Sequence, residues 1–325
     1  MAAARGASNA GNRPAGGDSM ATRPLTAWRL RLARGRTLVL RAGVPRVMGI
    51  LNVTPDSFSD GGRFLDPARA VEHGLRMLSE GAELLDLGAE STRPGGGVYG
   101  AGAAEVPESE EIERLLPVLE ALRRRTDAPI SVDTRKAAVA RAALEAGADL
   151  INDVGTLRDP ALLAAVAEAG CPAVAMHSRG VLATMQRTIA FEDVVREVAA
   201  ELEEACCRGV RAGIARDQMV LDPGLGFGKT RAQNLELLCH TAPLLACGRP
   251  LLFGASRKSF LAPENGRPGF RPSPVPADQR LAASLAAAGW ATRCGAALLR
   301  VHDVAETVQF LGSWQAIAQA GANPR

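Results

Sequence analysis

The feature that most constrains the fold of this chain is an alternation, repeated eight times, of short apolar runs and amphipathic stretches. The apolar runs are rich in Val, Ile and Leu and lack polar alternation, which is typical of parallel strands covered on both faces. The expected strands are 46–51, 83–88, 129–133, 148–152, 172–177, 218–222, 250–255 and 296–301. The expected helices are 67–80, 108–125, 136–146, 159–169, 191–213, 231–247, 277–293 and 304–319.

Eight strand–helix units predict a single-domain (β/α)8 TIM barrel over residues 37–325, with a doubly wound sheet as the alternative that periodicity leaves open. A barrel places functional side chains just after the strand C-termini. Asp and Asn at such junctions often only cap helices, which would account for Asp153 or Asp303. Capping does not account for polar residues at all eight ends, which are Asn52, Glu90, Asp133, Asn152, His177, Asp222, Lys258, Arg300 and His302.

Residues 1–36 carry seven Arg against one Asp and predict a basic, disordered extension, with a targeting peptide as the alternative. Since the whole chain has a net charge of +3, the remainder is near −3. That balance gives no electrostatic footprint for nucleic acid, and 4% aromatic residues argue against base stacking. No apolar run approaches the ~18 residues of a membrane span.

The six cysteines form no CxxC pair, which favours reduced thiols, a cytoplasmic location and no structural zinc. Lys and Arg together number 38, yet only Lys136, Lys229 and Lys258 are lysines. A lysine retained against that background indicates a place where a compact ammonium works and a planar guanidinium does not.

Two of the expected strand–helix loops are suited to move or to hold an anion. The segment 52–62 contains Thr54-Pro55-Asp56 and two glycines, so a long loop that closes over a ligand is predicted. In the second loop Arg93 stands before Pro94, which places a positive charge on a restrained backbone.

The remaining strand ends indicate a flat heterocycle at one side and phosphate at the other. A carboxylate only accepts hydrogen bonds whereas an amide also donates, so Asp133 with Asn152 suits a pterin or purine edge. Asp222 precedes a glycine run that resembles a P-loop but has the wrong spacing; the glycines would let a ring approach the backbone. Arg300 and His302 follow the last strand, where barrels commonly bind phosphate.

Taken in order, these segments resemble the dihydropteroate synthases of the pterin-binding barrel family. The resemblance rests on 52–62 (NVTPDSFSDGG), 91–95 (STRPG), 131–135 (SVDTR), 152–154 (NDV), 176–177 (MH), 222–229 (DPGLGFGK), 256–259 (SRKS) and 300–304 (RVHDV), and extends from about residue 45 to 312.

The resemblance implies an Mg²⁺-assisted condensation of 6-hydroxymethyl-7,8-dihydropterin diphosphate with 4-aminobenzoate in folate synthesis, and a homodimer. It implies that the pterin is held by Asp133, Asn152, Met176, Asp222, Phe227, Gly254 and Lys258. It implies that diphosphate is held by Asn52, Arg93, Arg300 and His302, with Asn52 also at Mg²⁺. The 4-aminobenzoate site would comprise Phe58, Thr92, Pro94 and Ser259. Asp60, Arg93 and Lys258 would be catalytic, with Asp60 and Arg93 on closing loops.

Three segments depart from the family pattern: a longer second loop around 96–104, the stretch 178–186, and the Pro-rich stretch 263–276. They leave sulfonamide sensitivity open. Two other functions compete. A non-catalytic pterin-binding paralogue should have lost the diphosphate residues, which are all present here. A pterin-dependent methyltransferase would not need the 256–259 block or Arg300 with His302.

Overall fold

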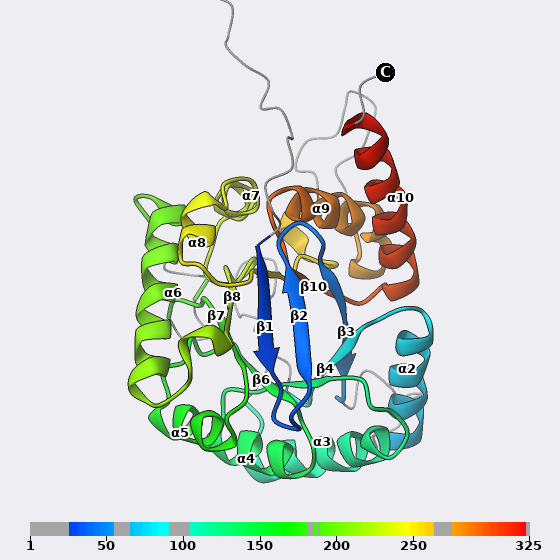
Figure 1. Ribbon diagram of the computed structural model, residues 1–325, viewed down its shortest axis with the longest axis vertical. Helices are drawn as coiled ribbons and strands as arrows, with labels where there is room; N and C mark the ends of the chain where they lie inside the picture. Colours follow the sequence, from blue (N-terminus) through cyan, green and yellow to red (C-terminus); the bar gives the residue numbers. More distant parts are fainter. Residues whose placement is uncertain are drawn as a thin grey trace, which may run out of the picture.

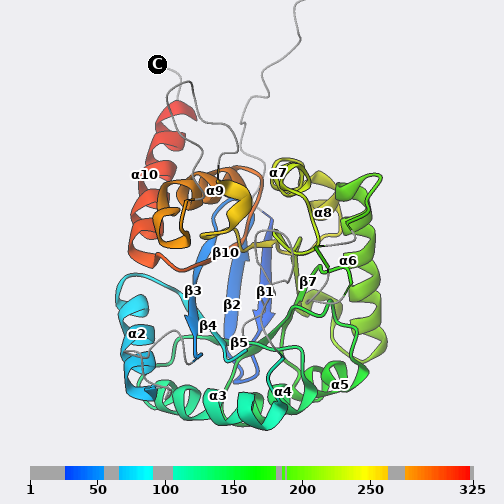
Figure 2. The same ribbon diagram turned by 180° about the vertical axis from the view of Figure 1, so that it is seen from behind.

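The computed structural model describes residues 26–54, 66–90, 105–180, 185–186, 189–262 and 275–322. It contains a ring of parallel strands surrounded by helices, with a two-stranded hairpin across one mouth (Figures 1 and 2). The hairpin strands are β1 (Ala27–Arg31) and β2 (Thr37–Arg41). The parallel strands are β3 (Arg46–Asn52), β4 (Leu84–Gly88), β5 (Ile130–Asp133), β6 (Leu150–Asp153), β7 (Ala173–Met176), β8 (Met219–Asp222), β9 (Leu252–Phe253) and β10 (Leu298–Val301).

The helices occupy the intervals between these strands. They are α2 (Pro67–Ser79), α3 (Glu108–Arg123), α4 (Ala137–Glu145), α5 (Pro160–Ala169), α6 (Val194–Arg211), α7 (Arg231–Cys239), α8 (Ala242–Ala246), α9 (Leu281–Arg293) and α10 (Val304–Ala322). Asp66 and Asp159 accept hydrogen bonds from the first-turn amides of α2 and α5, as their positions before a proline predict. Most strand and helix bounds lie within a few residues of the sequence prediction. The exceptions are β9, which covers two residues of the expected strand 250–255, and α9, which begins four residues after the expected start at 277.

The parallel strands close into a barrel. Their order is β8-β7-β6-β5-β4-β3-β10-β9, and every neighbouring pair is parallel. A parallel bridge between Leu221 and Leu251 joins the two outer strands, and the Leu221 amide donates to the Pro250 carbonyl at 2.9 Å. A doubly wound sheet has two open edges, so this closure excludes it and confirms the predicted (β/α)8 barrel.

The N-terminal boundary differs from the prediction. The expected disordered extension ended at residue 36, but β1 and the turn after it lie within that range and pair with β2. The hairpin was missed because its first strand lies in the Arg-rich stretch. The arginines there obscure the alternation of three apolar positions that would otherwise indicate a strand. Residues 1–25 lie outside the described part of the chain, so the rest of that prediction stays a prediction.

The expected helix 231–247 is also divided. It breaks at His240 and Thr241, and α8 begins just before Pro243. Proline has no amide hydrogen and its ring crowds the preceding turn, so an uninterrupted helix through this position is disfavoured. The outer layer is otherwise as predicted.

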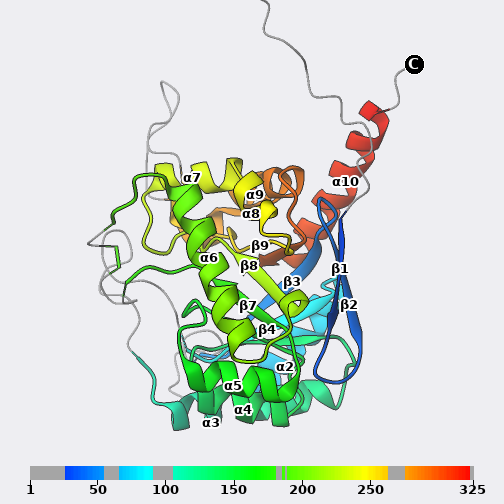
Figure 3. The same cartoon turned by 60° about the vertical axis from the view of Figure 1, so that its left-hand side comes forward.

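The hairpin seals the N-terminal mouth of the barrel, on the side of the molecule opposite the strand C-termini (Figure 3). Leu30, Leu32, Leu38 and Leu40 are at most 7% exposed and pack against the apolar residues that begin the barrel strands. Within the described residues, no helix is both long and apolar enough to cross a membrane.

Candidate active site

A buried ion cluster joins four strands at the C-terminal end of the barrel. Arg300 of β10 donates from Nε to Asp86 Oδ2 of β4 at 2.5 Å and from Nη2 to Asp133 Oδ2 of β5 at 2.8 Å. The amide of Asn152, on β6, donates from Nδ2 to the same Asp86 oxygen at 3.1 Å. Asp86 is fully buried. The barrel therefore brings together side chains that are up to 214 positions apart in the chain.

Several acceptors in this cluster lack a protein partner among the described residues. They are Asp86 Oδ1, Asp133 Oδ1, Asn152 Oδ1 and the hydroxyl of Ser131. A buried polar atom without a hydrogen bond costs about 1–3 kcal/mol, so native proteins rarely leave several together without a purpose. Carboxylate and amide oxygens accept hydrogen bonds, and this group therefore suits a ligand that presents several N–H donors.

The charges in the cluster are strongly coupled. Burial raises the pKa of Asp133 to about 7, against the opposing effect of Arg300. Burial alone would lower the pKa of Arg300, but Asp86 and then Asp133 hold it above its ordinary value. The guanidinium is therefore permanently charged, whereas Asp133 can change its protonation near neutral pH.

A second group lies beside it, where β8 and β9 end. Asp222 is buried, and its Oδ1 accepts a hydrogen bond from the Gly224 amide at 2.7 Å. Lys258 donates to the Leu225 carbonyl, and its Nζ stands 4.6 Å from the centroid of the Phe227 ring. Burial lowers the pKa of Lys258 to about 8, while Asp222 acts to raise it.

Apolar contacts complete this side of the site. Phe227 and Met176 pack together with Val154 and Met185 in a small buried cluster. A Cβ added at Gly254 would lie 3.9 Å from Arg300 and 4.0 Å from Asp222. Gly254 thus stands between the Arg300 group and the Lys258 group, and the two groups form one site.

His302 follows directly after the last residue of β10. Its Nδ1 is 3.0 Å from the Ser256 hydroxyl, and its backbone amide donates to the same oxygen at 3.2 Å. Burial, and then Arg300, lowers the pKa of His302 to about 3. The neutral ring therefore offers an anion a single N–H, and not the positive charge that a protonated histidine would bring.

Several strand-end residues form hydrogen bonds or ion pairs with other parts of the protein. Asp153 accepts hydrogen bonds from the amides of Gly155 and Leu157, as turn formation would predict. The Asp303 side chain instead forms an ion pair with Arg257. His177 contacts α6 and Lys229, so it does not join the group around Arg300 as its strand-end position suggested.

The glycine run after Asp222 also contributes to packing within the protein. A Cβ at Gly224 would lie 1.8 Å from the carbonyl oxygen of His177, and the Gly224 φ of +64° is in the left-handed region. At this position the close neighbour is the backbone of His177, directly after β7. Glycine is required there for packing between adjacent loops.

The other predicted site residues are placed as follows. Asn52 is exposed at the end of β3, and Ser259 begins a short 3₁₀ turn that ends at Leu261. Phe58, Asp60, Thr92, Arg93 and Pro94 lie outside the described residues.

Sequence reasoning missed Asp86 and Ser256. Asp86 interrupts the apolar run Leu84–Gly88, and a carboxylate within a strand buried on both faces was a signal that could have been used. Ser256 was noted only as part of a motif, and its contact with His302 depends on the register of β9 and β10, which sequence does not reveal.

The chain matches the family model described as "Pterin binding enzyme" over residues 48–302. The dihydropteroate synthase of Escherichia coli K12 is 43% identical over 281 residues, which cover 86% of this chain and 94% of that protein. A probable bifunctional folylpolyglutamate synthase/dihydropteroate synthase of Haloferax volcanii is 46% identical over 262 residues. The match covers 81% of this chain but only 29% of the archaeal protein.

Solved structures give the same likeness. A Xanthomonas albilineans dihydropteroate synthase with 4-aminobenzoic acid has a TM-score of 0.78 and 47% identity, covering 90% of this chain and 99% of that one. The same enzyme with 7,8-dihydropteroate has a TM-score of 0.74 and 45% identity, covering 89% and 98%. A Yersinia pestis dihydropteroate synthase with a sulfonamide drug has a TM-score of 0.79 and 44% identity, covering 90% and 99%.

Proposed function

This chain belongs to the family of pterin binding enzymes, and we propose that within that family it is a dihydropteroate synthase. As a transferase, it joins 6-hydroxymethyl-7,8-dihydropterin diphosphate to 4-aminobenzoate and releases diphosphate and 7,8-dihydropteroate. The observation that carries the proposal is the single buried site in which unpartnered acceptors stand beside Lys258 at one end and Arg300 with His302 at the other. Relatives and solved structures with aminobenzoate or product support the same activity.

The pterin would lie against the acceptors. Asp133 and Asn152 would accept from its ring N–H groups on one side, and Asp222 would do so on the other. Lys258 would donate to a ring acceptor, and Phe227 with Met176 and Gly254 would form the apolar surfaces against the ring. This arrangement would satisfy Asp133 Oδ1 and Asn152 Oδ1, two of the oxygens that have no protein partner, and so would stabilise the complex.

The reaction needs charge placed correctly more than it needs a nucleophile. As the bond between the pterin CH₂ and the diphosphate oxygen breaks, Arg300 and His302 would bind the charge that gathers on the leaving group. The dihydropterin then carries positive charge, which the carboxylates of Asp133 and Asp222 would stabilise. The amine nitrogen of 4-aminobenzoate forms the new C–N bond and loses a proton. No covalent enzyme intermediate is required.

Mg²⁺ is the proposed cofactor, with Asn52 as its protein ligand. No group of three His, Cys, Asp or Glu suited to a metal occurs within the described ranges, so a complete protein cage is absent from them. Mg²⁺ commonly binds through one or two protein oxygens together with substrate phosphates and water, and the exposed Asn52 amide at the β3 end fits that role. Its chemistry would be to neutralise diphosphate charge.

The aminobenzoate site and the moving loops remain proposals from the resemblance. Phe58, Thr92, Pro94 and Ser259 would surround the second substrate. Asp60 and Arg93 would reach the reacting groups from the first and second loops, and Arg93 would add a further cation to the diphosphate.

The binding partners, the cellular location and the oligomeric state are proposals as well. Small-molecule substrates are supported by the complexes of the solved relatives, and a sulfonamide that competes with aminobenzoate is expected to inhibit. The six free cysteines support action in a reducing cytoplasm. We also propose a homodimer and no nucleic-acid binding.

The deciding experiment incubates the purified chain with the pterin diphosphate, 4-aminobenzoate and Mg²⁺ and measures dihydropteroate by chromatography. Omission of each component is the control. Formation of dihydropteroate supports the proposal. Binding of the pterin without product would indicate a non-catalytic paralogue. Product formed from a methyl donor in place of aminobenzoate would indicate a methyltransferase.

A further inference from the structure

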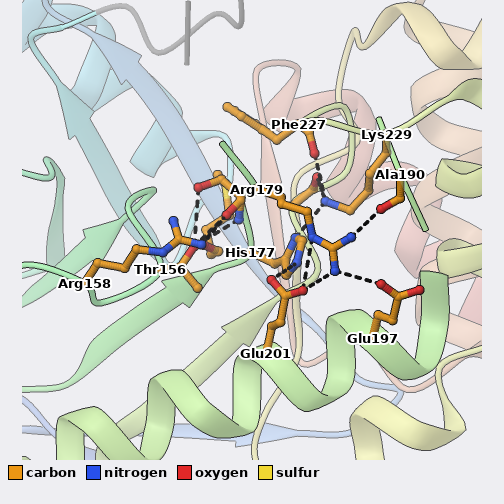
Figure 4. Close-up of polar contacts among 12 residues, drawn as sticks. Thr156, Arg158, His177, Arg179, Ala190, Glu197, Glu201, Phe227 and Lys229 are labelled. Carbon is orange, nitrogen blue, oxygen red and sulfur yellow. Dashed lines mark hydrogen bonds and ion pairs between the residues drawn. The ribbon is translucent and has the colours of Figure 1, made fainter. Parts of the chain in front are cut away.

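Lys229 lies at the centre of a buried polar relay that the proposed reaction does not use. Its Nζ is 3.0 Å from the Gly224 carbonyl, 2.9 Å from the Phe227 carbonyl and 3.0 Å from Nδ1 of His177 (Figure 4). Lys229 is 3% exposed and His177 is fully buried. An ammonium has three N–H donors, and three acceptors surround this one.

The far side of His177 fixes the direction of these hydrogen bonds. Its Nε2 is 3.1 Å from Oε2 of Glu201 on α6, and the pKa of that carboxyl is lowered to about 2, first by its bond to His177. A carboxylate can only accept, so Nε2 carries the ring proton and Nδ1 is the acceptor. Lys229 must then donate to Nδ1. Burial lowers the pKa of Lys229 to about 7, but a neutral amine with two hydrogens would leave one of the three acceptors unsatisfied, so the geometry favours the ammonium.

The relay is held from outside by Arg179. Its guanidinium pairs with Glu201 and, at 2.8 Å, with Glu197 of the same helix (Figure 4). It also lies 3.9 Å from the centroid of the Phe191 ring. Glu201 is therefore held by Arg179 through one carboxylate oxygen while the other oxygen faces His177. The relay extends from Arg179, which lies against the partly exposed surface of α6, to the buried ammonium of Lys229. Glu201 and His177 connect the two.

The inner end of the relay holds the turn that forms one wall of the site. Lys229 joins the Gly224 and Phe227 carbonyls and so closes the 224–229 turn on itself. The same turn supplies the Leu225 carbonyl to which Lys258 donates, and the Phe227 ring over which Lys258 stands. A shift of the turn would therefore move both features that orient the Lys258 ammonium.

We propose that Lys229, with His177 and Glu201, is a positioning residue that sets the pterin-facing turn and, through it, Lys258. The inference rests on the proposed function, because it concerns the substrate that Lys258 holds. It assigns no chemical step to Lys229. It predicts that the relay governs affinity for the pterin and has little influence on affinity for aminobenzoate.

The first test replaces Lys229 with methionine, which keeps the length and removes all three donors. With each substrate varied in turn, we expect KM for the pterin diphosphate to rise about tenfold or more, since one charge-assisted hydrogen bond alone is worth about that factor. KM for 4-aminobenzoate should change less than about twofold. Lys136→Met is the matched control, because Lys136 is also buried but binds Glu90 and Glu111. It should leave the pterin KM within about twofold of the parent value.

The second test acts at the accessible end of the relay and does not depend on the folding of the Lys229 variant. Glu201→Gln keeps an oxygen that accepts from His177, whereas Glu201→Leu removes it. We expect the Gln variant to keep a pterin KM near that of the parent and the Leu variant to shift it in the same sense as Lys229→Met. Equal effects of Gln and Leu, or an unchanged pterin KM in folded Lys229→Met, would overturn the inference. A parent protein without synthase activity would instead refute the proposed function.

Discussion

At the N-terminal end of the barrel, leucines from the β1–β2 hairpin meet the first residues of the strands in a dry apolar contact. Toward the C-terminal end, strands of the same barrel contribute Asp86, Asp133, Asn152 and Arg300, and several oxygens there have no protein partner among the described residues. Burial of apolar side chains at the N-terminal end stabilises the fold, whereas burial of polar atoms without partners at the C-terminal end destabilises it. The barrel therefore separates the residues that maintain the fold from those prepared for a ligand, and substitutions at the two ends should have opposite consequences.

The largest expected effect is on activity at the C-terminal end. Lys258→Ala removes the ammonium that lies between Asp222 and the Phe227 ring, and kcat/KM for synthesis should fall about 10²–10³-fold, the typical effect of losing one preorganised donor. Thermal stability should change little, because a buried charge is lost along with its contacts. Steady-state kinetics and calorimetry measure the two quantities. Arg196→Ala, at a highly exposed position of α6, is the control. A stable variant with full activity would break the comparison.

The counterpart at the N-terminal end is Leu40→Ala. Leu40 is fully buried in the contact between hairpin and barrel, so the free energy of unfolding should fall by about 3 kcal/mol. The kcat/KM of the remaining folded enzyme should stay within about twofold. Urea unfolding followed by circular dichroism gives the first value. Val44→Ala, at a 39% exposed position, should lose much less stability. An activity loss as large as that of Lys258→Ala would show that the two ends are coupled.

A smaller effect concerns pH. Because the pKa of Asp133 is raised from 3.8 to about 7, the folded protein retains a proton that the unfolded chain has lost in this interval. This group therefore makes the fold less stable as the pH rises from about 4 to about 7. Asp133→Asn removes that dependence, so its unfolding free energy relative to the parent should increase across the same interval. Urea titrations at several pH values test it, and a constant difference would contradict the assignment.

The smallest effect is expected at the diphosphate end. Ser256→Ala removes the hydroxyl that contacts Nδ1 of His302, and losing one neutral hydrogen bond should raise KM for the pterin diphosphate by about fivefold. Ser313→Ala, on the exposed surface of α10, should have no effect. If Ser256→Ala instead raised only the aminobenzoate KM, His302 would belong to the other substrate.

The sequence predicted the barrel well because its signal is local. Each buried strand is an apolar run, and Asp133, Asn152, Asp222 and Arg300 follow directly from strand ends that a barrel must bring together. The hairpin at 27–41 was missed because its apolar positions cover one mouth of the barrel, and sequence periodicity does not indicate that contact. The orientation of the His177 side chain and the need for glycine at position 224 depend on packing between the segment after β7 and the loop after β8. Sequence patterns do not reveal this contact, because the two segments are far apart in the chain.

The pairing of Arg300 with two carboxylates has a consequence for turnover. A guanidinium without carboxylate partners would bind free diphosphate tightly and would release it slowly. In the proposed role, a guanidinium already shared between Asp86 and Asp133 would attract the departing group without retaining it, since the carboxylates would regain their partner as the product leaves. The proposed role of Arg300 thus predicts that diphosphate, the first product, leaves readily before 4-aminobenzoate reacts.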